Sequence, residues 1–301
     1  MTGVAVRLFG AMLPIRIDEG PRMNHLDFKL TGVGGLPLYA QRWLPDREPS
    51  SVVVISHGLG EHSGRYRLLA EHLVAQGHGV YALDHRGHGR SGGPRANIER
   101  FNHVVTDFSA FVVSSAQENA DVPVFVIGHS MGGAIAFASA IQLQDSLRGL
   151  VLSAPALAAG EVVSSVKLAL VRLLSVIAPG AGALQLPPSA VSRDPQVVRD
   201  YESDPLVFHK SVPARTVLEL LQAMQGFPES ARNLRLPVLI QHGTADSLVP
   251  LSATRPLYQD LGSIDRTVKI YEGLYHEIYN EPERAVVIDD LCRWLDAHRA
   301  G

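Results

Sequence analysis

The pentapeptide Gly-His-Ser-Met-Gly at residues 128–132 constrains the fold of this chain more than any other feature. A run rich in β-branched residues (123–127) precedes it, and a run of small residues (133–140) follows it. This order predicts a strand, a sharp turn and a helix, with glycines that let the backbone bend tightly. Such a turn lifts the Ser130 hydroxyl above the edge of a sheet, where it can reach a substrate carbonyl. With 27 glycines in the chain the pentapeptide alone is weak evidence, and its context decides its meaning.

The rest of the chain alternates between strand and helix patterns. Helical patterns at 66–74 and 104–115 separate apolar runs that read as strands, and most of these runs are continuous, which indicates burial on both faces. The predicted strands lie at residues 36–43, 52–56, 79–83, 123–127, 149–153, 237–241 and 267–271. The sequence therefore predicts an α/β fold with a mostly parallel central sheet flanked by helices.

The alternation breaks at residues 156–235, a helical, proline-punctuated segment with no clear strand. It is too long for a loop, so we expect a helical cap inserted between two parts of the core, 23–155 and 236–301. The first cap helix, 162–177, is apolar around most of its circumference. It can be buried in the cap, or it can present one face to a lipid interface. Residues 1–22 read as a leader or start-site extension outside the core.

Composition excludes several classes of protein. A formal charge of −3 and a pI near 6.5 provide no basic surface for nucleic acid. The single cysteine, Cys292, cannot form an internal disulfide, and a reducing compartment fits best. Neither a signal peptide nor a membrane-spanning helix is recognisable, so we expect a cytoplasmic or peripherally membrane-associated protein.

A serine hydroxyl needs a base to become nucleophilic, and that base needs a carboxylate to orient it. On this fold the partners follow in the order serine, acid, histidine, each after a strand. Asp246 follows the strand at 237–241, and His276 follows the strand at 267–271. We therefore predict a triad of Ser130, Asp246 and His276. The competing carboxylates are Asp84, Asp107 and Asp265, which are misplaced in this order, and Asp204 in the cap, which remains open.

The reaction also needs donors for the negative charge that develops on the carbonyl oxygen. The Met131 amide, at the start of a helix, is one candidate. The Leu59 amide, in the glycine-containing loop after an early strand, is the other. His85 and His88 suggest a metal, but no cysteine or carboxylate joins them at ligand spacing. We therefore expect neither metal nor cofactor.

Four motifs together resemble the monoacylglycerol lipases of the α/β-hydrolase fold, from about residue 24 to the end. They are His-Gly-Leu-Gly-Glu-His-Ser-Gly-Arg-Tyr at 57–66, Asp-His-Arg-Gly-His-Gly-Arg-Ser at 84–91, Gly-His-Ser-Met-Gly-Gly at 128–133 and Tyr-Glu-Gly-Leu-Tyr-His-Glu at 271–277. Cap segments 192–195 and 201–206 extend the resemblance. It implies a serine hydrolase that cleaves monoacylglycerols to glycerol and fatty acid through an acyl-enzyme.

The resemblance also implies that the glycerol hydroxyls meet Glu61, Arg65, His129 and Tyr201, with the acyl chain in an apolar tunnel under the cap. From the residues alone, Glu61 and Arg65 could instead be a surface ion pair on one helical turn. Other readings stay open: a broader carboxylesterase or lysophospholipase, carbon-carbon bond hydrolysis or perhydrolysis, and a non-catalytic receptor. The sequence does not fix the oligomeric state.

Overall fold

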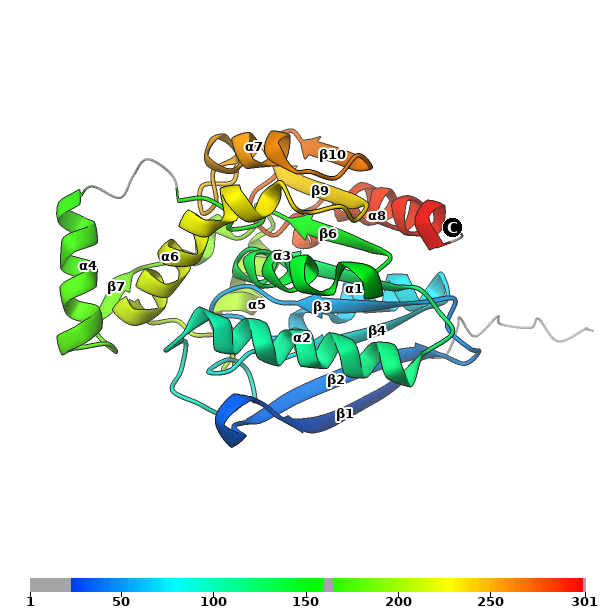
Figure 1. The fold of residues 1–301 in the computed structure, drawn as a ribbon, viewed down its shortest axis with the longest axis horizontal. Coiled ribbons are helices and arrows are strands. Elements are labelled where there is room, and N and C mark those ends of the chain that lie inside the picture. The colour runs from blue at the N-terminus through cyan, green and yellow to red at the C-terminus, as the bar shows by residue number, and fades with distance from the viewer. Residues whose placement is uncertain (1–22, 160–164, 300–301) are drawn as a thin grey trace, which may run out of the picture.

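The computed structural model describes residues 23–159 and 165–299, and its centre is an eight-stranded sheet (Figure 1). The strand order is β1-β2-β4-β3-β5-β6-β9-β10, and every neighbouring pair from β4 to β10 is parallel, while β2 runs antiparallel to β1 and β4. The strands are β1 (Met23–Thr31), β2 (Pro37–Pro45), β3 (Ser51–Ser56), β4 (His78–Leu83), β5 (Val124–His129), β6 (Gly149–Ser153), β9 (Val238–Gly243) and β10 (Arg266–Tyr271). The predicted mostly parallel sheet is confirmed.

Helices cover both faces of the sheet, which explains the continuous apolar runs. In β3, Val52 and Val54 pack into one core while Val53 and Ile55 pack into the other, because successive side chains of a strand point to opposite faces. The first core is closed by α2 (Phe101–Glu118), α3 (Met131–Leu143) and α7 (Leu251–Asp260). The second is closed by α1 (Arg67–Ala75) and α8 (Arg284–Arg299).

The segment between β6 and β9 forms a separate group of elements, which we call the insertion. Its described elements are α4 (Ser165–Ile177), β7 (Gly182–Leu184), α5 (Pro195–Ser203), β8 (Val212–Pro213) and α6 (Ala214–Ala231). The expectation of no strand here was wrong, since β7 and β8 pair antiparallel. Strands of three and two residues are too short to produce a recognisable apolar run. In Figure 1, α4 and β7 lie on the side toward which the parallel strands run.

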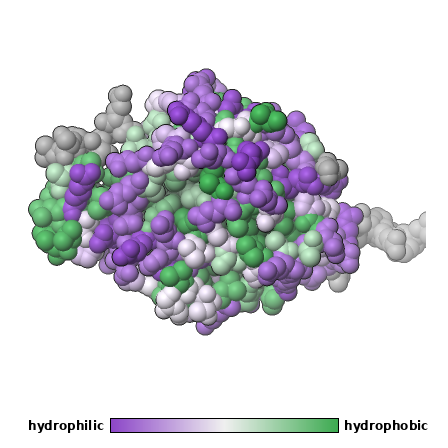
Figure 2. All heavy atoms as spheres, in the orientation of Figure 1, coloured by the Kyte–Doolittle hydropathy of each residue, from purple (hydrophilic) through white to green (hydrophobic). Residues whose placement is uncertain are grey.

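Helix α4 packs against α6 and leaves an apolar face uncovered. Leu170 and Leu173 are about half exposed, Val176 is 75% exposed and Ile177 is 68% exposed. Figure 2 shows apolar residues gathered at the end of the molecule where Figure 1 places α4. No helix in the described ranges is long and apolar enough to cross a membrane. The predicted leader at 1–22 and the predicted start of the first cap helix lie outside the described residues.

Candidate active site

Ser130 lies on the tight turn between β5 and α3, in a backbone conformation that few non-glycine residues adopt. Its φ is 54° and its ψ is −122°. The glycines around it are required by close packing: a Cβ on Gly132 would collide with the carbonyl oxygens of Ser56 and His57, and one on Gly128 would collide with Ala136. The pentapeptide therefore builds the strained turn that the sequence predicts, with a partly exposed serine at its tip.

His276 and Asp246 meet beside this turn. His276 Nδ1 lies 2.7 Å from Asp246 Oδ2, and both residues are buried. The His276 ring centroid is 4.6 Å from that of His129, the residue directly before Ser130. Within the described residues, Ser130 Oγ makes no hydrogen bond to His276, and such contacts commonly tighten only when substrate binds. The structure thus brings the three predicted residues to one end of the sheet.

The surroundings keep Asp246 charged. Burial alone raises the pKa of Asp246, but His276 and the hydrogen bond from His242 outweigh it, so the net pKa falls below its usual range. The backbone amides of Leu248 and Val249 also donate to Asp246 Oδ1, at 2.9 Å each. Burial lowers the pKa of His276, but the Asp246 carboxylate more than compensates and the net shift is upward. The carboxylate can therefore hold Nδ1 and leave Nε2 to act as a base.

Each competing carboxylate contacts a partner other than His276. The partners are His62 for Asp204 at 2.8 Å, Ser63 for Asp84 at 2.8 Å, Arg86 for Asp107 at 2.7 Å and His298 for Asp265 at 3.1 Å. Asp204, which the sequence left open, belongs to a contact between the insertion and the loop after β3. Geometry thus favours Asp246 as the partner of the histidine.

The loop after β3 lies against the serine turn. A Cβ on Gly58 would stand 3.3 Å from Ser130 Cβ. The Gly58 amide donates to Glu61 Oε1 at 2.6 Å. By contrast, neither the Leu59 nor the Met131 amide donates a hydrogen bond to any group of residues 23–159 or 165–299. Both amides predicted to bind the oxyanion are therefore available to a ligand.

His57, to which the sequence assigned no role, holds the Leu59 amide in place. The His85 amide donates to His57 Nε2 at 2.9 Å, so the proton of the neutral ring belongs on Nδ1. Nδ1 then donates to the Gly58 carbonyl oxygen at 2.8 Å. Because the C=O and N–H of a trans peptide point in opposite directions, holding the Gly58 carbonyl also fixes the Leu59 N–H. Burial lowers the pKa of His57 to about 4, which keeps the ring neutral.

The histidine-rich motif after β4 serves packing. The His85 ring centroid lies 4.4 Å from that of His57 and 5.8 Å from that of Phe108. No group of three His, Cys, Asp or Glu residues in the described ranges could hold a metal ion. His85 and His88 stand behind the loop that carries the Leu59 amide.

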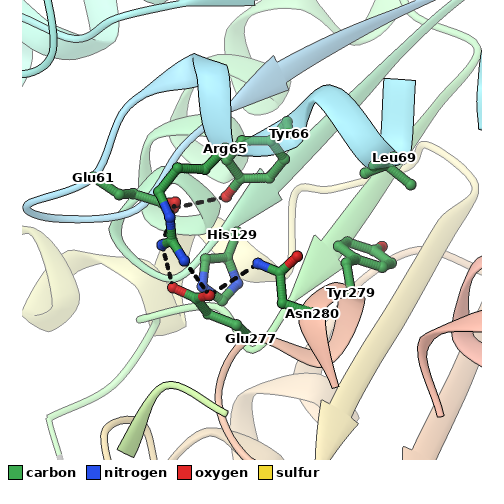
Figure 3. Close-up of a pocket in the computed structure, with 8 residues that line it drawn as sticks. All are labelled: Glu61, Arg65, Tyr66, Leu69, His129, Glu277, Tyr279 and Asn280. Carbon is green, nitrogen blue, oxygen red and sulfur yellow. Dashed lines mark hydrogen bonds and ion pairs between the residues drawn. The ribbon is translucent and has the colours of Figure 1, made fainter. Parts of the chain in front are cut away.

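A small polar pocket adjoins His129, with room for little more than a water molecule (Figure 3). It is lined by Glu61, Arg65, Tyr66, Leu69, His129, Glu277, Tyr279 and Asn280. The reading of Glu61 and Arg65 as a surface ion pair was wrong, because their side chains are only 5% and 11% exposed. Glu61 lies in the loop after β3, and Arg65 lies in the short 3₁₀ turn before α1.

Arg65 joins three parts of the chain. Its two terminal nitrogens lie 2.5 and 2.8 Å from the carboxylate oxygens of Glu277, and Nη1 lies 3.3 Å from Glu61. Its guanidinium also stacks over the ring of Tyr201 from the insertion, 4.7 Å from the centroid. The sequence assigned no role to Glu277; its only signal was a carboxylate directly after the predicted histidine.

His129 and Tyr201 are both buried in this region. His129 Nδ1 lies 3.1 Å from the Ser153 carbonyl oxygen, and burial together with the nearby His276 lowers the pKa of His129 to about 4. Its ring is therefore neutral, and with Nδ1 donating to the carbonyl its Nε2 remains an acceptor. The structure thus gathers all four residues predicted to contact glycerol.

The insertion is fastened to the loops that carry these residues. The Phe208 amide donates to the Gly60 carbonyl oxygen at 2.7 Å, and the Glu277 amide donates to the Val191 carbonyl oxygen at 2.8 Å. Val191, Tyr201 and Val207 form a small apolar cluster, against which Leu248 packs. The insertion therefore contacts the loops that follow β3, β9 and β10.

Comparisons with known proteins show the family of this chain. A family model described as serine aminopeptidase, S33, matches residues 47–283. The monoacylglycerol lipase of Mycolicibacterium smegmatis is 42% identical over 272 residues, 90% of this chain and 97% of its own length. The monoglyceride lipase of Homo sapiens is 35% identical over 274 residues, 90% of each chain. The crystal structure of Paleococcus ferrophilus monoacylglycerol lipase is 32% identical, with a TM-score of 0.75 over 92% of this chain and 99% of that one. The chain therefore belongs to the monoacylglycerol lipase family of serine hydrolases with the α/β-hydrolase fold.

Proposed function

We propose that this protein hydrolyses monoacylglycerols to glycerol and a fatty acid through an acyl-enzyme. The observation that carries the proposal is the contact between Asp246 and His276 beside the strained Ser130 turn, with a polar pocket next to it. The names of the relatives, monoacylglycerol and monoglyceride lipases, support the substrate class.

In this mechanism His276 Nε2 takes the proton of Ser130 as its oxygen attacks the ester carbonyl. Asp246, hydrogen-bonded to Nδ1, stabilises the imidazolium that forms. The Leu59 and Met131 amides bind the oxyanion, since both are free of acceptors in the described part of the chain. The imidazolium then protonates the leaving glycerol oxygen, and water attacks the acyl-enzyme by the same route.

The pocket has room for little more than a water molecule, but the polar groups that line it suit a hydroxyl at the glycerol end of the substrate. A hydroxyl both donates and accepts, and the pocket offers both kinds of partner: the Glu61 carboxylate and His129 Nε2 accept, and the Arg65 guanidinium donates. Tyr201 closes the same region from the insertion. Glu61, Arg65, His129 and Tyr201 are therefore our candidates for glycerol contacts.

We assign residues 156–235 as a cap that covers the site, between core parts 23–155 and 236–301. The uncovered apolar face of α4 supports lipid contact, because such a face is stabilised by burial in an interface. The cap would then bring the enzyme to a substrate that is barely soluble, as a peripheral and not a spanning protein.

Replacement of the nucleophile tests the catalytic assignment. Ser130→Ala should lower kcat on the order of 10⁶-fold and abolish labelling by a fluorophosphonate. Ser139→Ala is the matched control, since Ser139 is a buried serine of α3, the helix that follows Ser130, and its hydroxyl also has no partner. Turnover near the wild-type value in Ser130→Ala would overturn the assignment, and an unlabelled wild type would favour a receptor.

A substrate panel tests the substrate class. Hydrolysis rates should be compared for monoacyl, diacyl and triacyl glycerols and for lysophospholipids, and they should be highest with monoacylglycerols. The small pocket disfavours a second acyl chain, and its two carboxylates for one guanidinium disfavour the phosphate of a lysophospholipid. Faster cleavage of lysophospholipids would favour the lysophospholipase alternative. Equal cleavage of simple carboxylic esters would favour a broader carboxylesterase.

Vesicle co-sedimentation tests the lipid contact. Leu173→Asp places a charge on the exposed face of α4 and should lower partitioning onto neutral vesicles several-fold. Val113→Asp is the matched control, because Val113 is a 37% exposed apolar residue of α2, which is not part of the insertion. If the wild type does not partition at any lipid concentration, the cap does not bind lipid.

A further inference from the structure

The polar pocket contains a buried ion pair whose acidic member directly follows His276 in the chain. Glu277 is 6% exposed, and its two oxygens face the two terminal nitrogens of Arg65 at 2.5 and 2.8 Å. Asn280 donates a further hydrogen bond to Glu277 Oε2 at 2.9 Å. Both carboxylate oxygens are thus held in one orientation (Figure 3).

This pair connects the two loops that must stay aligned during the reaction. Arg65 belongs to the 3₁₀ turn that follows the Leu59 loop, and Glu277 belongs to the loop that carries His276. Glu61, which holds the Gly58 amide, also contacts Arg65. A movement of the His276 loop away from the Leu59 loop would therefore break a two-point ion pair in a buried place, which is costly.

The pair also leaves an excess of negative charge near the imidazole. Two carboxylates, Glu61 and Glu277, share the single guanidinium of Arg65. Burial raises the pKa of Glu277, but Arg65 outweighs this and brings the pKa to about 2, so the carboxylate is ionised. The charged groups that raise the pKa of His276 are Asp246 after β9, Glu277 in its own loop and Glu61 after β3, and the ring of His129 at the end of β5 lies against it.

We propose that Glu277 is a positioning residue for catalysis: its two-point pair with Arg65 fixes the His276 loop against the Leu59 loop, and its charge favours the imidazolium. It touches neither the reacting atoms nor the oxyanion. The proposal rests on one part of the proposed function: that the chain hydrolyses an ester with His276 as the base.

Glu277→Gln tests the charge while keeping the shape of the side chain. The pH profile of kcat/KM should be measured with a soluble short-chain ester such as p-nitrophenyl butyrate. A carboxylate near an imidazole raises the pKa of that imidazole. Loss of the Glu277 charge should therefore move the low-pH side of this profile, its acid limb, about one unit to lower pH. The plateau of kcat/KM should fall roughly 10-fold, because the imidazolium of the transition state loses a favourable charge.

Glu281→Gln is the matched control. Glu281 lies in the same loop, is fully buried, and pairs with Arg193 Nε at 2.5 Å and with the Arg193 amide at 2.6 Å, away from the pocket. Its loss should lower Tm and leave the acid limb unchanged. An acid limb that moves equally in both variants, or in neither, would overturn the proposal.

Glu277→Asp separates the two contributions and serves if Glu277→Gln does not fold. Aspartate keeps the charge but is too short to hold both nitrogens of Arg65, so we expect a wild-type acid limb with a reduced kcat. Wild-type kcat in Glu277→Asp would show that the two-point contact has no catalytic role. A wild-type chain without esterase activity would reject the proposed function instead.

Discussion

The strained backbone at Ser130 predicts that glycine at this position stabilises the fold while abolishing catalysis. A non-glycine residue at φ 54° and ψ −122° costs about 1–3 kcal/mol, and glycine removes that cost. Glycine itself costs about 0.5–1 kcal/mol through the entropy of the unfolded chain. Since the Ser130 hydroxyl has no partner within the described residues, Ser130→Ala loses no hydrogen bond and provides the reference. Ser130→Gly should therefore be more stable than Ser130→Ala by about 1 kcal/mol.

Thermal unfolding followed by circular dichroism measures this difference. In a chain of 301 residues, about 1 kcal/mol corresponds to about 2 °C in Tm. Ala134→Gly is the control, because Ala134 is a fully buried residue of α3 in ordinary helical conformation, and it should lower Tm. If Ser130→Gly unfolds at or below the Tm of Ser130→Ala, the turn is not strained and the steric explanation of the pentapeptide fails.

Three further predictions concern the His276–Asp246 pair. Asp246→Asn should lower kcat by about 10⁴-fold with little change in KM, because the amide favours the wrong imidazole tautomer; a loss confined to KM would contradict this role. Activity of the wild type should decline as the pH falls through the raised pKa of His276, above its ordinary value of 6.5, since the base must be neutral. An acid limb centred below pH 6.5 would contradict the upward shift. Because the pKa of Asp246 is depressed in the folded state, its contribution to stability is complete above its unfolded pKa of about 3.9 and is lost progressively as the pH falls from there through the lower pKa of the folded state. The stabilities of wild type and Asp246→Asn should therefore approach each other over that pH range, which acid denaturation measures.

Two features of the sequence were enough to predict the sheet, the turn and the order of the site residues. They are the continuous apolar runs and the pentapeptide at 128–132. The tendency to form a strand buried on both faces depends on side chains that are neighbours in the sequence, and the turn at Ser130 depends on glycines within three positions of it. These are local properties, so they can be read without knowing the fold. The positions of Asp246 and His276 after β9 and β10 followed from the same strand pattern, because parallel strands end at one edge of the sheet.

The choice between Asp204 and Asp246 and the surroundings of Arg65 were decided only by the tertiary structure. Asp204 and Asp246 both follow the serine in the chain, and only packing shows that one contacts His62 and the other His276. Arg65 and Glu277 are 212 positions apart, so no local pattern pairs them. Without that partner, a surface ion pair on one helical turn stayed open as an alternative reading of Glu61 and Arg65. Their burial results from the core and the insertion closing over them, and long-range contacts of this kind depend on the whole fold.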